Sequence, residues 1–173
     1  NSLEIDVYYN SENMNSHISI PTDKTVSLRS LQTYNSSGGL DSTFEQGESV
    51  RVVSKATDPF TADDIEYVNL TVYYPNGTKK MEKQQMTVFD SDTSTPPYWN
   101  LYEYTFSLDI TDVGGKYSLE VTATDIQGNQ DQISSTFTIP VEPGVSVYPD
   151  QTETSNPLTT VSYEVFVENI GNS

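Results

Sequence analysis

The fold is decided between residues 115 and 139, which read GKYSLEVTATDIQGNQDQISSTFTI. Apolar and polar residues alternate over 117–123, and again over 133–139. A period of two is typical of a β-strand with one buried face. Residues 127–129 are turn formers and lie between the two runs. We therefore predict that this stretch is an antiparallel hairpin at the edge of a sheet.

Similar alternations flank the hairpin on both sides, whereas no long segment repeats with the helical period of 3.6. Residues 75–77 are Pro-Asn-Gly, which favours a tight turn because Asn and Gly accept the positive φ that short hairpins require. We expect an all-β chain whose other strands cover residues 3–9, 16–20, 26–34, 49–57, 65–74, 81–89, 98–110, 145–148 and 159–167.

Two proline-containing stretches, 21–24 and 140–143, divide the chain into three parts. We predict the terminal strands of a preceding β module in 1–22, a β-sandwich in 23–141, and the start of a second module in 142–173. A chain of 173 residues has room for one complete sandwich with a remainder too short for another. We therefore expect a piece of a longer protein, with any signal peptide or anchor lying outside it.

The chain is strongly acidic, with 25 Asp and Glu against 8 Lys and Arg and a formal net charge of -17. Such a charge repels nucleic acid and anionic membranes, and no apolar run is long enough to span a bilayer. There is no cysteine, a single histidine, and no motif for a nucleophile, a phosphate-binding loop or a zinc site. We expect a non-enzymatic protein that requires no cofactor.

Three stretches resemble parts of immunoglobulin-like repeats in large archaeal and bacterial cell-surface proteins, of the S-layer-associated or adhesin-like kind. Residues 115–125, with 128–129 and 135–139, resemble the closing hairpin of such a repeat. Residues 44–60, FEQGESVRVVSKATDPF, resemble its opening, and 161–172, VSYEVFVENIGN, resemble the start of a CARDB-like repeat. The resemblance implies an immunoglobulin-like antiparallel β-sandwich with flanking partial β modules, and it specifies a fold rather than an activity.

Asp112, Gly115 and Tyr117 match the Asp-x-x-Gly-x-Tyr spacing of a tyrosine corner. In that motif the tyrosine hydroxyl ties a strand to the backbone just upstream of it. The pair Gly114-Gly115 makes such a corner sterically feasible, so we expect Tyr117 to be fixed in this way.

Asparagine-linked glycosylation is the most specific local signal in the chain. The sequence N-x-S/T without proline occurs at Asn35, Asn69 and Asn76. Asn69 is expected on the polar face of its strand, and Asn76 at a hairpin tip. The alternative is chance occurrence in a chain rich in Asn, Ser and Thr.

Several aspartates are expected at one end of the sandwich, where two of its loops and the start of its first strand meet. Calcium takes six to eight oxygen ligands, often carboxylates, and bound at a domain junction it would stiffen the joint. The alternative is that these are ordinary turn-forming residues. The candidate calcium ligands are Asp23, Asp58, Asp63, Asp64, Asp125 and Asp131.

A third candidate is the aromatic cluster around the single tryptophan, namely Tyr98, Trp99 and Tyr102. Aromatic faces bind sugars and protein partners, and the alternative is that Trp99 packs in the core. From the sequence we expect an extracellular structural or adhesive module that contacts neighbouring β modules of its own protein. One rival is a specific glycan- or protein-binding module that uses Trp99; the other is a surface-layer or filament subunit assembled by strand addition.

Overall fold

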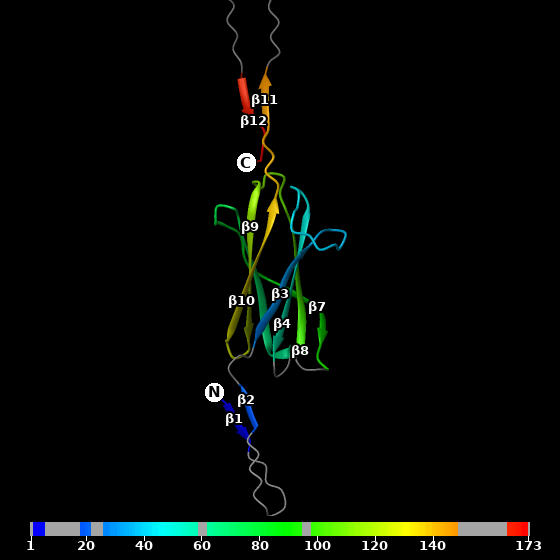
Figure 1. Cartoon of the computed structure of the whole chain (residues 1–173), viewed down its shortest axis with the longest axis vertical. Coiled ribbons are helices and arrows are strands. Elements are labelled where there is room, and N and C mark those ends of the chain that lie inside the picture. Colours follow the sequence, from blue (N-terminus) through cyan, green and yellow to red (C-terminus); the bar gives the residue numbers. More distant parts are fainter. Residues whose placement is uncertain are drawn as a thin grey trace, which may run out of the picture.

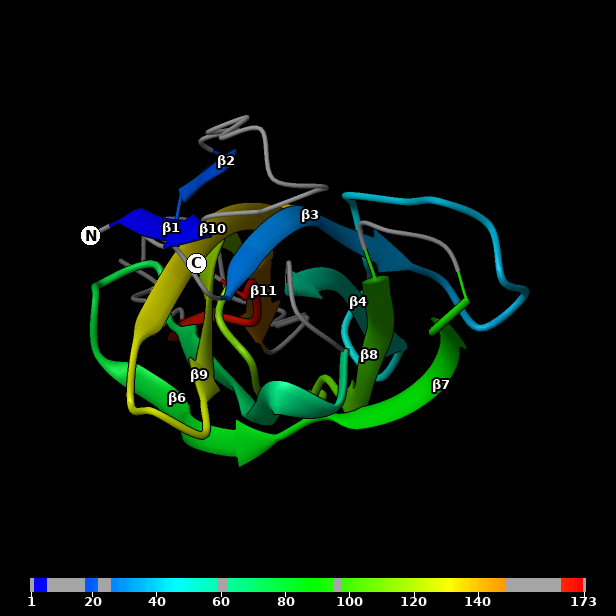
Figure 2. The same ribbon diagram turned by 90° about the horizontal axis from the view of Figure 1, so that it is seen from below.

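A computed structural model describes residues 2–5, 18–21, 26–58, 62–94, 98–148 and 166–172. Two four-stranded antiparallel sheets face one another (Figures 1 and 2). The first, here the β9 sheet, runs in the order β10 (Gln130–Ile139), β9 (Gly115–Asp125), β5 (Ile65–Tyr73), β6 (Lys79–Gln85). The second, the β4 sheet, runs in the order β3 (Ser27–Tyr34), β4 (Ser49–Asp58), β8 (Tyr98–Ser107), β7 (Thr87–Asp92). This strand order is that of an immunoglobulin-like sandwich, so the predicted fold class is confirmed.

The predicted hairpin forms between β9 and β10, with Tyr117 opposite Phe137 and Val121 opposite Ile133. Alternate residues of β9 point into the sandwich, where they are fully buried, and the residues between them point outward. The same alternation in β5, which pairs with β9, extends this buried face, and the alternation in β4 supplies the face opposite it. The largest fully buried apolar side chains of the core between the two sheets are those of Phe44, Val50, Val52, Val68, Leu70, Val72, Tyr117, Leu119, Val121, Phe137 and Ile139.

One edge of the sandwich is closed by a segment that changes sheets. The predicted single strand 81–89 is two strands, because β6 pairs with β5 whereas β7 pairs with β8. Met86 lies between them, is buried, and donates its backbone N–H to Val68 O at 2.8 Å. Figure 2 shows β6 and β7 following one another along this edge.

At the other edge, residues 42–44 run parallel to the end of β10. Phe44 N–H donates to Thr138 O, and Thr138 N–H donates to Ser42 O, both at 2.9 Å. A predicted strand also proves too long at 98–110, because β8 ends at Ser107. Leu108 is still buried, but Ile110 lies in the following turn and is 77% exposed. The prediction was too long because the alternation of apolar residues in the sequence continues to Leu108 and Ile110, beyond the last residue of β8.

Short hairpins lie at opposite ends of the sandwich (Figure 1). One pairs β1 (Ser2–Ile5) with β2 (Ile18–Pro21), and the other pairs β11 (Val145–Tyr148) with β12 (Phe166–Asn169). The rest of the strands predicted at 3–9, 16–20 and 159–167 falls on residues outside the described ranges. The 3-10 turn η1 (Ala62–Asp64) precedes β5. The described part of the chain contains no helix long and apolar enough to cross a membrane.

Candidate functional site

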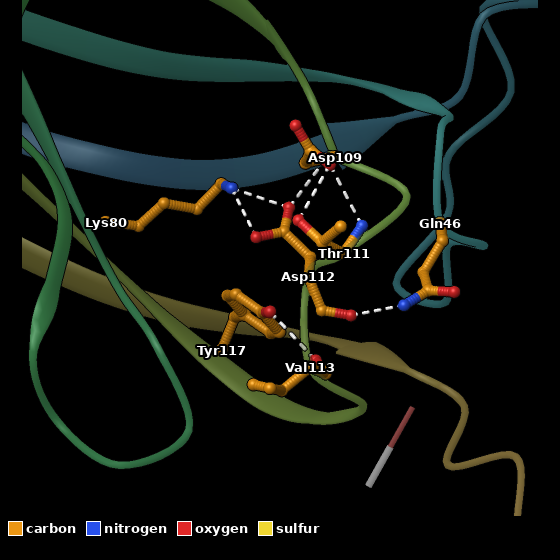
Figure 3. A network of polar contacts seen from close by, with 7 residues as sticks. All are labelled: Gln46, Lys80, Asp109, Thr111, Asp112, Val113 and Tyr117. Atoms are coloured by element: carbon orange, nitrogen blue, oxygen red, sulfur yellow. Dashed lines mark hydrogen bonds and ion pairs between the residues drawn. The ribbon is translucent and has the colours of Figure 1, made fainter. Parts of the chain in front are cut away.

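The loop between β8 and β9 is fixed by a tyrosine corner, as its spacing predicts. The hydroxyl of Tyr117 donates to Val113 O at 2.8 Å (Figure 3). Gly115 has φ +136°, and a Cβ there would lie 2.9 Å from Cγ of Pro75. Both the conformation and the lack of space require glycine at this position. The corner therefore holds the start of β9 against the turn that follows β5.

A buried ion pair lies beside this corner. Lys80 Nζ, from β6, contacts Asp112 Oδ1 at 2.6 Å and Oδ2 at 2.5 Å (Figure 3). The two side chains are only 13% and 3% exposed. Asp112 Oδ2 also accepts the backbone N–H of Asp109 at 2.7 Å, and its backbone carbonyl accepts a hydrogen bond from Gln46. Asp112 thus links the loop between β8 and β9 to strand β6 through Lys80 and to the turn before β4 through Gln46.

The turn that presents Asp112 is organised by Asp109. Its carboxylate accepts both the backbone N–H and the hydroxyl of Thr111, at 2.9 and 2.8 Å. These two hydrogen bonds lower the pKa of Asp109. Lys80 also lies 5.3 Å from the ring centre of Tyr74, so its charge meets both a carboxylate and an aromatic face. Through these contacts the loop before β9 is tied both to β6 and to the turn that carries Gln46.

Replacing Tyr117 by Phe is expected to change how stability depends on alkaline pH. Burial, with a further contribution from the charge of Asp112, raises the pKa of Tyr117 from 10.0 to about 12. The folded chain therefore holds the phenolic proton more tightly than the unfolded chain. This stabilisation is complete below about pH 10 and is lost as the pH rises toward 12.

Urea unfolding at pH 8 and at pH 11 would measure this. Tyr117→Phe should lose about 1 kcal/mol at pH 8, because the hydrogen bond to Val113 is gone, yet fall less steeply toward pH 11 than the wild type. Tyr34→Phe is the control, since that hydroxyl contacts only the exposed Gln32. If the stability of Tyr117→Phe fell as steeply between pH 8 and pH 11 as that of the wild type, a raised pKa of Tyr117 would be contradicted.

The same corner contacts the C-terminal segment of the chain. The backbone N–H of Gly114 donates to Asn172 O at 2.6 Å. The side chain of Asn172 accepts the N–H of Glu142 at 2.6 Å and donates to Pro140 O at 2.9 Å. Asn172 therefore links the corner to the segment that leaves β10.

Glycines make this contact possible. A Cβ on Gly114 would lie 2.9 Å from Pro140 O and from Val141 Cα, and one on Gly171 would lie 2.3 Å from Glu142 O. Real Cβ atoms do not approach backbone so closely, so here two stretches of backbone pack directly on each other. We call the contact among Gly114, residues 140–144 and residues 170–172 the junction.

The predicted glycosylation residues lie in three different settings. Asn35 is half-buried at the start of a turn, where its side-chain oxygen accepts the backbone N–H groups of Ser37 and Gly39. Asn76 is exposed in a turn, where its side-chain oxygen accepts the backbone N–H of Thr78. Asn76 also lines a hollow of about 450 Å³ beside Lys80. Asn69 is half-buried on the outer face of β5. Their occupancy stays a prediction.

The loops that carry the candidate calcium ligands do meet at one end of the sandwich. Ile126 N–H donates to Asp64 O at 2.9 Å, and Asp131 Oδ2 accepts Leu28 N–H at 2.9 Å. Asp125 is fully buried, and its Oδ1 accepts the N–H groups of Gln127 and Asn129 at 3.0 and 2.8 Å.

Asp58, on β4, is fully buried, whereas Asp63 and Asp64 lie in the turn η1. Asp23 lies outside the described residues. Among the residues that the structure describes, no group of three or more acidic, His or Cys side chains gathers in a metal-holding arrangement. Calcium binding stays a prediction.

The three aromatic candidates do not share one face. Tyr98 and Tyr102 point into the sandwich, where Tyr102 is 4% exposed and its pKa is raised by burial. Trp99, one position from Tyr98, lies on the outer face of the β4 sheet and is half-buried. The ammonium of Lys55 sits 4.4 Å from its ring centre. Any surface built on Trp99 would therefore include Lys55 rather than the two tyrosines.

Sequence reasoning missed most of the corner and the junction. Lys80 is 32 residues from its partner Asp112, and Asn172 is 32 residues from Pro140. Only the Asp-x-x-Gly-x-Tyr spacing marked this region, and Asp112 is its first residue. Gly171 carried a further signal, because a glycine that follows a strand often marks a close backbone approach.

No protein-family model matches the chain. Solved structures with some likeness include the alkylpurine DNA glycosylase AlkC of Pseudomonas fluorescens bound to DNA, at 12% identity and a TM-score of 0.46. Another is the sporulation control protein Spo0M of Bacillus subtilis, at 15% identity and a TM-score of 0.43. A third is a Niemann-Pick type C2 protein of the Japanese carpenter ant, at 9% identity and a TM-score of 0.38.

The three matches cover 67%, 69% and 67% of this chain. The chain spans only 30% and 51% of the length of the first two, and 92% of the third. All three TM-scores are below 0.5, so these likenesses carry no inference about activity.

Proposed function

We propose that the chain is a non-catalytic structural and adhesive module of a multi-domain extracellular surface protein, held at a fixed angle to a following β module. The observation that carries this proposal is the junction. Its backbone-to-backbone packing at Gly114 and Gly171 restricts movement of the β11–β12 hairpin against the sandwich. A spacer needs such stiffness, since flexible links between modules would let the chain fold back on itself.

The composition supports the same proposal. A net charge of -17 keeps a surface protein soluble and apart from nucleic acid and anionic lipid. The residues at the tyrosine corner form hydrogen bonds and an ion pair that join strands to loops. The expected partners are neighbouring β modules of the same protein, with surface glycans or other surface proteins as adhesive targets.

Stiffness at the junction can be measured directly. The chain has no cysteine, so Thr105→Cys and Glu168→Cys would place spin labels only on β8 and β12, at two exposed positions. The distance distribution between the labels, from pulsed electron resonance, should be narrow. Gly114→Ala should broaden it, because the added Cβ would lie 2.9 Å from the backbone of 140–141.

Gly39→Ala is the matched control. A Cβ there meets only the flexible side chain of Asn35, at 3.3 Å or more, so the distribution should stay narrow. A broad distribution in the labelled chain without Gly114→Ala would overturn the proposal of a stiff spacer.

A further inference from the structure

The outer face of the β9 sheet is polar and hollowed. Four rows of side chains cross it, because residues paired between antiparallel strands lie on the same face about 5 Å apart. The strand register gives the rows Tyr67–Thr124–Gln130, Asn69–Thr122–Gln132, Thr71–Glu120–Ser134 and Tyr73–Ser118–Thr136. Tyr67 and Tyr73 mark the two ends of β5, which are about 20 Å apart at the rise of an extended strand.

Two hollows follow this face and share Glu120. The first measures about 300 Å³ and is lined by residues of β5, β9 and β10, with Lys83 from β6. The second measures about 370 Å³ and continues toward Tyr73. Both volumes are at the lower end of the range for small-ligand sites. We call the two hollows together the polar groove.

The lining chemistry fits a sugar. Apart from Lys83 and Glu120, whose charges cancel, the side chains of the first hollow are neutral amides, hydroxyls and one phenol. Amides and hydroxyls both donate and accept hydrogen bonds, as sugar hydroxyls do. The ring of Tyr67 adds an apolar surface of the kind that sugars stack on. In the part of the chain that the structure describes, the side-chain amides of Asn69 and Gln132 have no protein hydrogen-bond partner.

The backbone beside the groove is strained at one residue. Lys83 has φ +48°, in the left-handed region that residues other than glycine rarely adopt. The pairing of β5 with β6 shifts register between Leu70 and Val72, and Lys83 N–H donates instead to the hydroxyl of Thr71 at 3.2 Å. Irregularities of this kind redirect a side chain and gather at functional sites. Here the redirected side chain is the one cation of the first hollow.

We propose that the polar groove binds a neutral oligosaccharide. A carboxylated or sulfated sugar fits less well, because the groove offers one cation against Glu120 and the whole chain carries a charge of -17. The sugar could come from a partner's glycan or from a glycan attached at Asn69, which lines the same hollow. This binding site is separate from the role as a spacer and from Trp99, which lies on the other sheet.

Titration calorimetry would test the proposal on the full chain made in a bacterial cytoplasm, where Asn69 carries no glycan. The probes are short oligomers of glucose, galactose, mannose and N-acetylglucosamine, with an oligomer of glucuronic acid for comparison. At least one neutral oligomer should bind saturably, and the acidic one should not. Tyr67→Ala and Gln132→Ala should each weaken binding at least about tenfold.

Gln132 is exposed, so Gln132→Ala should fold even if Tyr67→Ala does not. Trp99→Ala is the control and should bind as the wild type does. Failure of every neutral oligomer to bind, or equal binding by Gln132→Ala, would overturn the proposal.

The source of the sugar can be identified with protein from a glycosylating host. Soluble sugar that binds despite a glycan on Asn69 identifies a partner's glycan as the source. Binding that returns only after enzymatic removal of the Asn69 glycan identifies the chain's own glycan as the source.

Discussion

Replacing Lys80 by Met is expected to lower the free energy of unfolding by about 3–5 kcal/mol. The variant keeps most of the apolar stem of the side chain but leaves Asp112 as a buried carboxylate without its cation. Asp112 is only 3% exposed, so little water reaches its carboxylate to replace the lost partner. The hydrogen bond from Asp109 N–H remains, and one such bond does not offset the desolvation of a full charge. Urea unfolding at pH 7 measures the difference.

Lys79→Met is the matched control. Lys79 pairs with Glu82 three residues away, but those side chains are 47% and 53% exposed. An exposed pair contributes about 1 kcal/mol or less, since water solvates each charge when the other is removed. Comparable losses in Lys79→Met and Lys80→Met would show that burial of Asp112 does not determine the energetics of this corner.

The sequence was sufficient for the hairpin and the tyrosine corner because both are local. Residues 115–139 need only alternate and turn to form β9 and β10, and Tyr117 bonds to a carbonyl four residues earlier. The Lys80–Asp112 pair is a different case. It depends on β6 lying beside the loop before β9, and that placement follows from the pairing of the whole β9 sheet rather than from any short motif.

The change of sheet at Met86 could not be predicted for a related reason. Residues 79–92 contain no glycine or proline to mark a break, so a single strand was the natural interpretation of 81–89. What separates β6 from β7 is the hydrogen bond from Met86 to Val68 and the burial of Met86. Both are tertiary contacts. The polar groove was missed similarly, because its rows bring together residues from strands far apart in the sequence.

Replacing Phe137 by Ala is expected to lower the free energy of unfolding by about 3–5 kcal/mol, the usual range for removal of a buried aromatic ring. Phe137 is 1% exposed and joins elements of both sheets. Its ring stacks on Tyr117 with centres 4.9 Å apart, meets Phe44 edge-on at 5.7 Å, and lies 6.1 Å from Phe106. Removal of the ring opens a cavity and also ends three aromatic contacts.

The control for this variant is Phe89→Ala, because Phe89 on β7 is 42% exposed. That ring meets the guanidinium of Arg51 at 4.8 Å, a surface contact worth about 1 kcal/mol or less. In chemical unfolding, Phe137→Ala should therefore lose several times more free energy of unfolding than Phe89→Ala. Because Phe137 stacks on Tyr117, Phe137→Ala should also expose the phenol of Tyr117 and lower its pKa. An ultraviolet titration of the tyrosines measures this change. A titration curve identical to that of the wild type would show that the ring of Phe137 does not contribute to the burial of Tyr117.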